Sequence, residues 1–533
     1  MFFSKIFSKV SNLVLKSFWS RDDGSPSCSS SLRTPALGGH VLVFPGEYSH
    51  WFNMRNIMEE LVRRNHSVTV LVGDASPSVD YNNSRYAAKF NFLVFKVPFS
   101  RAEFHSVTEE FIHISMYELH RLSLPYKIQR MSDWIRRSFQ YALQQCDSML
   151  KNEQLMATLR ASKFDAVLLD PMMMCGDLVA NVLGLPFILS LRFSFGSIWE
   201  RHCGQVPAPP SFVPPSPLIY TDRMTFKERL VSVLTYVWFC QNKSLMVWLP
   251  VRTGSPFSFC ESLGNADIWL FRTFWDVETP RPTVPNFKRV GGLHCKPANQ
   301  LPEDLEAFVQ SSGNAGGVVA SFGSMVTNLT TETVDVIAAA FGQIPQKVRT
   351  NTKVIDWIPQ NDLLGTHTKT KIRVTQRHGG TNGLYEVIYH AVPLVGIPLF
   401  ADQHSNLAQV GHQGAAIVLD FNHFTSDELT EALQAVIDQP SYKSTMQRLS
   451  ALHHDRPMTP LNTAVFWVEF VMRHGGAHLR LASRDLNWFQ YDSVDTGLAL
   501  LVVMAITTVI CWRMVHCFLR CCYCSRQRRE KED

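Results

Sequence analysis

Short apolar runs alternate with longer segments of helical periodicity through the first half of the chain. HVLVFPG and SVTVLVG have the pattern of buried strands, and residues 52–65 between them have helical periodicity. FDAVLLD (164–170) and LPFILSL (185–191) repeat the strand pattern around a helical segment over 175–182. This order of strand, helix and strand predicts a doubly wound parallel sheet.

The same elements recur in the second half and predict a second sheet. The segments expected as its strands share short apolar runs: ADIWLFR (266–272), FKRVGGL (287–293), GGVVASFGS (316–324), TKVIDWI (352–358) and AVPLVGIPL (391–399). Prolines between the first two of these strands suggest an interdomain linker. We therefore predict two Rossmann-like α/β domains, residues 39–280 and 286–480, with ligands at the carboxyl ends of the strands.

Helical patterns in this half cover Thr331–Gln343, Ser426–Ile437 and Ala464–His474. The last of them carries aromatic residues on an amphipathic pattern. We expect it to pack across the domain junction or along a membrane surface.

Residues 496–519 form the longest apolar stretch of the chain. They number about 24, and roughly 20 are needed to span a bilayer. The single charge, Arg513, lies near one end, where its long stem can reach the headgroups. The basic tail, residues 520–533, is expected on the cytosolic side by the positive-inside rule, which places the preceding residues in a lumen.

The first 38 residues form an atypical N-terminal segment. Lys5, Lys9 and Lys16 interrupt every apolar run, so the continuous hydrophobic region of a signal peptide is missing. Thr34–Gly39 looks like the end of a cleavable signal. The upstream apolar residues recur on one side of a helix, which predicts a basic amphipathic helix. Such a helix serves as an interfacial anchor or as an organelle-type transit sequence.

Charge and cysteine usage narrow the function further. The net charge of +5 is modest and no Lys/Arg block lies in the body of the chain, which argues against nucleic-acid binding. Of the 12 cysteines, five cluster in and beside the apolar stretch, and the other seven are scattered without metal-ligand spacing. No metal site is therefore expected, and the disulfide pairing cannot be read from the sequence. Those near the apolar stretch are open to S-acylation or have no special role.

A glycine-rich turn entering a helix, RHGGTNGLYE, is the strongest chemical signal. Glycines let backbone N–H groups approach phosphate oxygens, and a helix N-terminus supplies partial positive charge. Glu386, Asp402 and Gln403 lie close to this turn in the sequence and have side chains that accept hydrogen bonds from sugar hydroxyls. The combination predicts a site for a diphosphate joined to a sugar.

Two residues of the N-terminal domain form a candidate acid–base pair. His50 follows the first strand and Asp170 ends another strand, so both lie at the same predicted edge of the sheet. A carboxylate beside an imidazole fixes its tautomer and stabilises its protonated form. The alternative is structural, with His50 capping a helix and Asp170 beginning a turn before Pro171.

Motifs spread over most of the chain resemble the UDP-glucuronosyltransferases. They are HVLVFPGEYSHWFNM, LLDPMMMCG, ADIWLFRTFWD, VGGLHCKP, FGSMV, DWIPQNDLLG, HGGTNGLYE, GIPLFADQ and VFWVEFVMRHGGAHLR. The resemblance implies a GT-B fold in which the N-terminal domain takes a small lipophilic acceptor and the C-terminal domain takes a UDP-sugar. It also implies an inverting, metal-independent transfer from UDP-glucuronic acid in the endoplasmic reticulum lumen, with no cofactor.

Residue roles carry over from the resemblance position by position. His50 matches the general base, Asp170 its acidic partner, and Arg272 a basic residue associated with the donor carboxylate. Gln360 lies where the family approaches the uracil, and Glu386 matches the ribose ligand. Asp402 and Gln403 match ligands of the sugar hydroxyls. The remaining matches are diphosphate contacts: Ser324, His378, Gly379, Gly380, Thr381, Asn382 and Gly383.

The chain departs from the family pattern beside this site. About a dozen residues, including a strand, are missing between Lys347 and Asn351. The strand before His378 contains Arg373, Gln376 and Arg377 where apolar residues are usual. Three functional alternatives therefore stay open. They are an active glucuronosyltransferase, an enzyme using UDP-glucose or UDP-galactose, and an impaired isoform that pairs with active relatives. Any homo-oligomeric state is unspecified.

Overall fold

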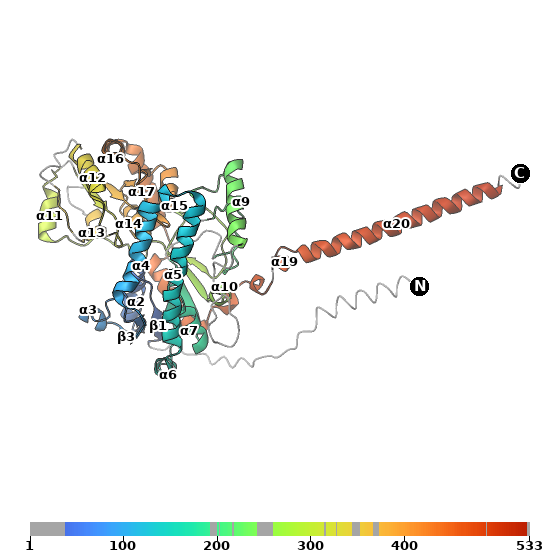
Figure 1. Cartoon of the computed structure of the whole chain (residues 1–533), viewed down its shortest axis with the longest axis horizontal. Helices are drawn as coiled ribbons and strands as arrows, with labels where there is room; N and C mark the ends of the chain where they lie inside the picture. Colours follow the sequence, from blue (N-terminus) through green and yellow to red (C-terminus); the bar gives the residue numbers. More distant parts are fainter. Residues whose placement is uncertain are drawn as a thin grey trace. The chain divides into compact units, whose positions relative to one another are not determined.

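The computed structural model describes the chain from Gly38 to Arg529 with several gaps. The described ranges are 38–191, 200–201, 203–215, 218–241, 259–313, 316–326, 328–343, 352–355, 357–365, 372–486 and 488–529. The predicted N-terminal helix and the shortened segment around residue 348 lie outside them. Two parallel sheets, each with its own helices, make up the body of the chain (Figure 1).

The first sheet has seven parallel strands in the order β3-β2-β1-β4-β5-β6-β7. Their bounds are β1 His40–Phe44, β2 Ser67–Gly73, β3 Asn91–Phe95, β4 Ala166–Leu169, β5 Phe187–Leu191, β6 Ile268–Phe271 and β7 Phe287–Arg289. The expectation that 266–272 and 287–293 open the second sheet is therefore wrong. Both segments pair with β5 or with each other, so the boundary between the sheets falls after Arg289.

The second sheet has four described strands in the order β11-β10-β9-β8, again all parallel. They are β8 Gly317–Ser321, β9 Ile372–Arg377, β10 Leu394–Gly396 and β11 Ala416–Val418. The charged segment before His378 thus does form a strand, paired on both sides. The predicted strand TKVIDWI is wrong, because residues 352–355 carry no strand assignment and Val354 is 90% exposed. A strand needs a hydrogen-bonding neighbour, and β8 pairs only with β9 among the described strands.

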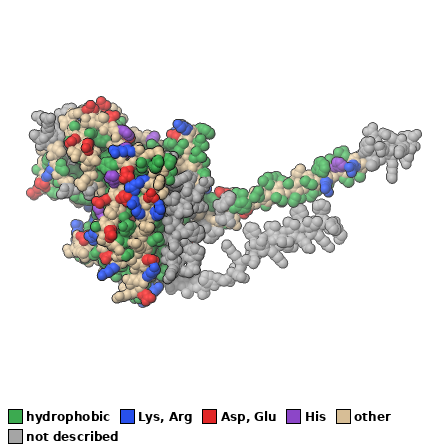
Figure 2. All heavy atoms as spheres, viewed as in Figure 1, with side chains coloured by type: hydrophobic (Ala, Val, Ile, Leu, Met, Phe, Trp, Pro, Cys, Tyr) green, Lys and Arg blue, Asp and Glu red, His purple; other side chains and the backbone are tan. Residues whose placement is uncertain are grey.

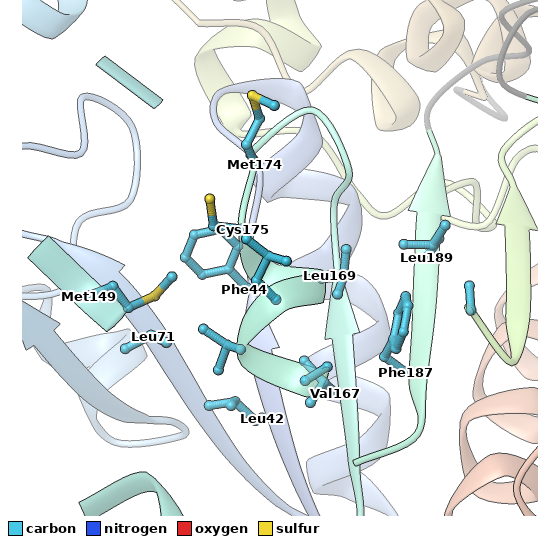
Figure 3. Packing of buried hydrophobic residues seen from close by; sticks show 14 of the residues in the cluster. Leu42, Phe44, Leu71, Met149, Val167, Leu169, Met174, Cys175, Phe187 and Leu189 are labelled. Atoms are coloured by element: carbon cyan, nitrogen blue, oxygen red, sulfur yellow. The ribbon is translucent and has the colours of Figure 1, made fainter. Parts of the chain in front are cut away.

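Alternating side chains of the first sheet fill two cores, one on each face. Leu42 and Phe44 of β1 enter one cluster with Val167 and Leu169 of β4 (Figure 3). Their neighbours in sequence, such as Val43, point to the opposite face and enter the other cluster. The period of two along each strand produces this division.

The helices associated with the first sheet cover both faces. They are α2 Ser49–Arg63, α3 Ser84–Ala87, α4 Arg101–His113, α5 Leu124–Leu150, α6 Glu153–Ala161, α7 Gly176–Leu183, α9 Phe226–Gln241 and α10 Phe259–Gly264. Short π- and 3-10 turns, Ile114–Glu118 and Leu119–Arg121, connect α4 to α5. Two disulfides, Cys146–Cys175 and Cys203–Cys260, join parts of this region, a pairing that the sequence alone did not provide.

The second sheet carries a further set of helices. They are α11 Glu303–Gln310, α12 Thr331–Gln343, α13 Gln360–Leu364, α14 Thr381–Tyr389, α15 Gln403–His412, α16 Ser426–Asp438 and α17 Pro440–His454. The predicted helices over 331–343 and 426–437 are confirmed by α12 and α16.

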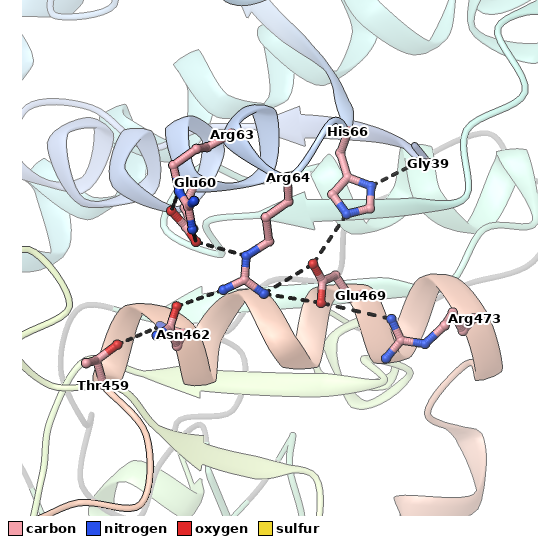
Figure 4. Close-up of polar contacts among 9 residues, drawn as sticks. All are labelled: Gly39, Glu60, Arg63, Arg64, His66, Thr459, Asn462, Glu469 and Arg473. Carbon is pink, nitrogen blue, oxygen red and sulfur yellow. Dashed lines mark hydrogen bonds and ion pairs between the residues drawn. The ribbon is translucent and has the colours of Figure 1, made fainter. Parts of the chain in front are cut away.

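Helix α18 (Pro460–His474) follows the second domain in sequence but packs on the first sheet. Ala464, Val465, Val468 and Val471 are buried in the same cluster as Val41 and Val43 of β1. A polar cluster between α18 and the end of α2 supports this contact, because Arg64 donates to Glu469 and Asn462, and His66 faces Glu469 (Figure 4). The predicted amphipathic helix over 464–474 is confirmed, and its apolar face packs on the first sheet.

Replacing Val468 with alanine is expected to lower the free energy of unfolding by about 2 kcal/mol, because it removes two buried carbons from a packed core. Val468 is 0% exposed, whereas Phe466 on the same helix is 36% exposed and provides the matched control, Phe466→Ala. Urea unfolding followed by tryptophan fluorescence measures the difference. Equal losses in the two variants would contradict the packing of α18 on the first sheet.

The last helix, α20 (Val494–Arg529), contains the predicted membrane span 496–519. Within it, Val494–Cys521 is 28 residues long, with a mean hydropathy of 2.2, and none of it is buried. Hydrophobic side chains cover its surface (Figure 2). Its length and composition fit a single membrane anchor. Three short helices precede the anchor: Ala477–Leu479, Ala482–Asp485 and Trp488–Tyr491. Residues 530–533, which follow it, lie outside the described ranges.

Candidate active site

His50 and Asp170 meet at the carboxyl edge of the first sheet. Asp170 follows β4 directly, and His50 lies in the first turn of α2, just after the neighbouring strand β1. The distance from His50 Nδ1 to Asp170 Oδ2 is 2.6 Å, and the Met172 N–H donates to Asp170 Oδ1 at 3.0 Å. The N-cap of α2 is Tyr48 rather than His50, so the capping alternative is wrong.

Arg272 lies beside this pair. It follows β6, and its Nη2 is 3.4 Å from Asp170 Oδ2 and 3.5 Å from His50 Nδ1. Arg272 is 2% exposed, so it is a buried member of the site and not a surface residue. Burial acts to raise the pKa of Asp170, but His50 and Arg272 outweigh it and hold that pKa below its usual value. The carboxylate is therefore ionised and fixed against the imidazole.

Close backbone packing brings the pair together. A Cβ on Gly46 would lie 2.6 Å from the Cβ of His50 and 2.9 Å from Asp170 Oδ2, so only glycine fits at that position. Tyr48 adopts φ 53°, a left-handed conformation that is uncommon outside glycine. Such strain is found where a turn must aim a functional side chain.

Asp170→Asn is expected to destabilise the protein at neutral pH, with the difference from wild type shrinking in acid. The folded-state pKa of Asp170 lies below 3.8, so its ionised form contributes stability above that pH. That contribution is lost as the pH falls from neutral through the lowered folded-state pKa. Urea midpoints of both proteins across this range measure the effect. A difference independent of pH would contradict it.

The glycine-rich turn lies at the carboxyl edge of the second sheet. Strand β9 ends at Arg377, and α14 begins at Thr381 after Gly379, which has φ +82°. A Cβ on Gly379 would lie 2.5 Å from Leu407 Cγ, so this position requires glycine both for its conformation and for its packing. The first N–H groups of α14 are thereby presented at the end of the sheet.

Asp402 and Asn406 hold this turn in place, and Gln403 holds the neighbouring segment at Leu399 and Phe400. Thr381 Oγ1 donates to Asp402 Oδ2 at 2.9 Å, and Asn406 Nδ2 donates to the same oxygen at 2.7 Å and to the Gly379 carbonyl at 3.0 Å. Gln403 Oε1 accepts from two backbone N–H groups, of Leu399 and Phe400. The structure thus shows a supporting role for two residues that the resemblance matches to sugar ligands. Their role toward a sugar stays a prediction.

Gln360 and Glu386 form the far side of the same site. Gln360 begins α13, and its Nε2 donates to Glu386 Oε2 on α14. His294 approaches the other carboxylate oxygen at 3.8 Å and contacts the Asn382 carbonyl at 3.1 Å. His294 was not among the site residues expected from the sequence. It lies shortly after β7, and a position at the carboxyl end of a parallel strand is typical of ligand-binding residues. Burial, followed by the charge of Glu386, raises the pKa of the neighbouring Cys295 well above its usual value.

His378 joins the two turns that were predicted to contact phosphate. Its ring packs against Gly323, where a Cβ would lie 2.6 Å from Nε2, and its Nδ1 is 3.4 Å from the Ser321 carbonyl at the end of β8. Ser324 follows in the same turn and is half-buried. The ends of β8 and β9 therefore lie side by side, as the resemblance requires.

A hydrogen bond between Asn53 and Asn382 connects the two halves of the candidate site. Asn53 Nδ2, one helical turn after His50 on α2, donates to Asn382 Oδ1 in the glycine-rich turn at 2.6 Å. The acid–base pair and the phosphate-type turn therefore belong to one site between the two sheets. Among the described residues, no group of three or more His, Cys, Asp or Glu side chains has the arrangement of a metal site.

Known proteins match almost the whole length of this chain in sequence. Residues 39–529 match the family model described as UDP-glucoronosyl and UDP-glucosyl transferase. Human UDP-glucuronosyltransferase 2A2 is 47% identical over 518 residues, covering 92% of this chain and 94% of its own length. Mouse UDP-glucuronosyltransferase 2A1 is 47% identical over 88% of this chain and 92% of its own length.

Solved structures with low sequence identity share the fold. A complex of a Polygonum tinctorium UDP-glucosyltransferase with 3,4-dichloroaniline matches with a TM-score of 0.54 at 16% identity, covering 82% of this chain and 99% of that one. The structure of LpCGTa in complex with UDP matches with a TM-score of 0.51 at 16% identity, with the same coverage. The predicted GT-B fold with a C-terminal apolar helix is confirmed. The chain belongs to the UDP-glucuronosyl and UDP-glucosyl transferase family of glycosyltransferases.

Proposed function

We propose that this protein transfers glucuronic acid from UDP-glucuronic acid to a hydroxyl group of a small lipophilic acceptor. The observation that carries the proposal is the continuity of the site. The His50–Asp170 pair lies one turn of α2 from the hydrogen bond that joins Asn53 to the glycine-rich turn. General base and phosphate site are thus held in one arrangement, as a direct displacement requires.

In the proposed step, the acceptor oxygen attacks the anomeric carbon of the sugar. The acceptor O–H bond breaks and its proton passes to His50 Nε2, because Nδ1 faces Asp170. The bond from the anomeric carbon to UDP breaks at the same time, and UDP leaves from the opposite side with inversion. Asp170 stabilises the imidazolium that forms.

The second domain supplies the donor site in this proposal. The N-terminus of α14 and the turn Gly379–Gly383 bind the diphosphate, whose negative charge grows as UDP leaves. Glu386 binds the ribose, and Gln360 lies beside it for the uracil. Human and mouse relatives are named UDP-glucuronosyltransferases, and this supports glucuronic acid over glucose or galactose.

We place the protein in the endoplasmic reticulum membrane with its catalytic domains in the lumen. The single apolar helix α20 supports membrane anchoring, and the basic tail after it favours a cytosolic C-terminus. The disulfides Cys146–Cys175 and Cys203–Cys260 fit an oxidising compartment.

A donor panel on microsomes that contain the full chain tests this function. The expected result is transfer to a phenolic acceptor from UDP-glucuronic acid, with kcat/KM higher than for UDP-glucose or UDP-galactose. The readout is radiolabelled product. Microsomes from cells that lack the chain are the control. Preference for a neutral sugar would reject the glucuronate assignment, and product from none of the donors would reject the transferase proposal.

The exposed segment Thr352–Ile355 supports a second candidate function. It lies outside the second sheet, and Trp357 next to it is 68% exposed. The sequence just before it is also shorter than the family pattern, which would alter one wall of the donor site. In that case the protein pairs with active relatives and modulates them without binding the donor. A UDP-dependent thermal shift of the purified chain decides against this role, and its absence together with co-precipitation of an active relative supports it.

A further inference from the structure

Arg377, the last residue of β9, has a buried guanidinium. The side chain is 2% exposed, and Nε, Nη1 and Nη2 have no hydrogen-bond partner among the residues that the structure describes. Burial lowers the pKa of Arg377 to about 10, with Glu386 acting in the opposite direction, so the group stays charged at neutral pH. A buried charge without a partner is costly, and native proteins pair such groups with an anion.

The guanidinium lies against the first turn of α14. A Cβ on Gly383, the third residue of that helix, would be 3.4 Å from Arg377 Nη1 and 3.2 Å from Gln360 Nε2. Arg377 therefore lies beside the N-terminal turn of a nine-residue helix, next to Gln360 and one turn before Glu386. An anion bound by the first N–H groups of α14 would lie next to Nη1.

The protein's own carboxylate does not take this place. One oxygen of Glu386 accepts from Gln360, and the other faces His294 at 3.8 Å. No ion pair within 4.0 Å joins Arg377 to a carboxylate in the described part of the chain. The strand itself is intact, since β9 pairs with β8 and β10, so the charge is not accommodated by unfolding of the strand.

We propose that Arg377 is a further donor-binding residue, whose guanidinium pairs with the diphosphate of the nucleotide sugar held at the start of α14. This inference rests on the proposed function. A guanidinium forms two parallel hydrogen bonds to phosphate oxygens, which adds orientation as well as charge. With Arg377 present, the phosphates contribute more to the affinity for UDP than they would if only the N-terminus of α14 bound them.

Two effects of Arg377→Met follow, and they have opposite signs. Removing an uncompensated buried charge is expected to raise the Tm of the unliganded protein. It is also expected to weaken UDP binding about 10- to 100-fold, the usual worth of hydrogen bonds to a charged group. Binding of uridine, which has no phosphate, is expected to stay within about twofold of wild type. Arg377→Lys keeps the charge but not the planar fork, so it should restore part of the UDP affinity.

Calorimetric titration of the full-length chain in detergent, with UDP and with uridine as probes, tests the inference. The matched control is Arg373→Met, which removes an arginine from the exposed position of the same strand and should leave UDP binding unchanged. Equal UDP affinity in wild type and Arg377→Met overturns the inference while the proposed function stands. A lower Tm with equal losses for UDP and uridine assigns Arg377 a structural role and also overturns it. Failure of wild type to bind UDP overturns both proposals.

Discussion

Replacing His50 with alanine is expected to lower kcat for glycosyl transfer by about 10²- to 10⁴-fold, the range that general-base catalysis contributes. The imidazole is the group that accepts the acceptor proton, and its Nδ1 is fixed by Asp170 at 2.6 Å. The donor turn lies on the other domain and does not use this ring. The affinity for UDP should therefore be unchanged, so the loss should fall on kcat rather than on donor binding.

Initial rates with UDP-glucuronic acid and a phenol, combined with calorimetric UDP titrations, separate the two quantities. His423→Ala is the matched control, because His423 is an exposed histidine on the second domain, paired with Asp420. A His50→Ala variant that keeps more than about a tenth of the wild-type kcat would show that another group takes the proton. If the affinity for UDP fell together with kcat, His50 would have a structural role in the site and not a catalytic one.

Gly379→Ala is expected to abolish measurable UDP binding and to destabilise the second domain by about 1–3 kcal/mol. The residue has φ +82°, and a new Cβ would meet Leu407 Cγ at 2.5 Å and the Gln403 carbonyl at 3.0 Å. The turn has to shift, and the first N–H groups of α14 shift with it. Both the electrostatic site and the bonds to Asn406 depend on that backbone.

Gly342→Ala is the matched control for this change. Gly342 lies in α12, has an ordinary helical conformation, and has nothing within 4 Å of a new Cβ. Alanine there should stabilise the helix by a few tenths to about 1 kcal/mol and leave UDP binding intact. Thermal unfolding with and without UDP measures both variants. Normal UDP binding by the Gly379→Ala variant would contradict the proposal that this turn binds the diphosphate.

Much of the fold was predictable because a buried parallel strand leaves a clear pattern. The strands β1, β2, β4 and β5 were read as short apolar runs, and the site residues His50 and Asp170 followed from their position at strand ends. Sheet membership was not predictable for β6 and β7. Their apolar pattern suits either sheet, and the prolines between them resembled a linker, although both strands belong to the first sheet.

Other features depend on contacts between distant residues, which the sequence pattern does not contain. TKVIDWI has the composition of a strand, but the described part of the second sheet gives it no neighbour. His294 reaches Glu386 because the loop after β7 meets α14, where Gly291 packs against Tyr385. Arg377 stands where apolar residues are usual, and the structure buries it in a strand that is paired on both sides. The sequence showed the unusual charge, and only the fold showed that it points to the first turn of α14.

The return of α18 to the first sheet affects how the protein is made. A ribosome releases β1 to β7 long before α18, which is synthesised after the whole nucleotide domain. Until then, the cluster around Val41 and Val43 lacks Val465 and Val468 and leaves apolar surface open to solvent. The N-terminal domain therefore cannot finish folding as an independent early unit, as domains generally do during synthesis. Its core closes only near the end of translation, so this apolar face stays uncovered for most of the synthesis of the chain.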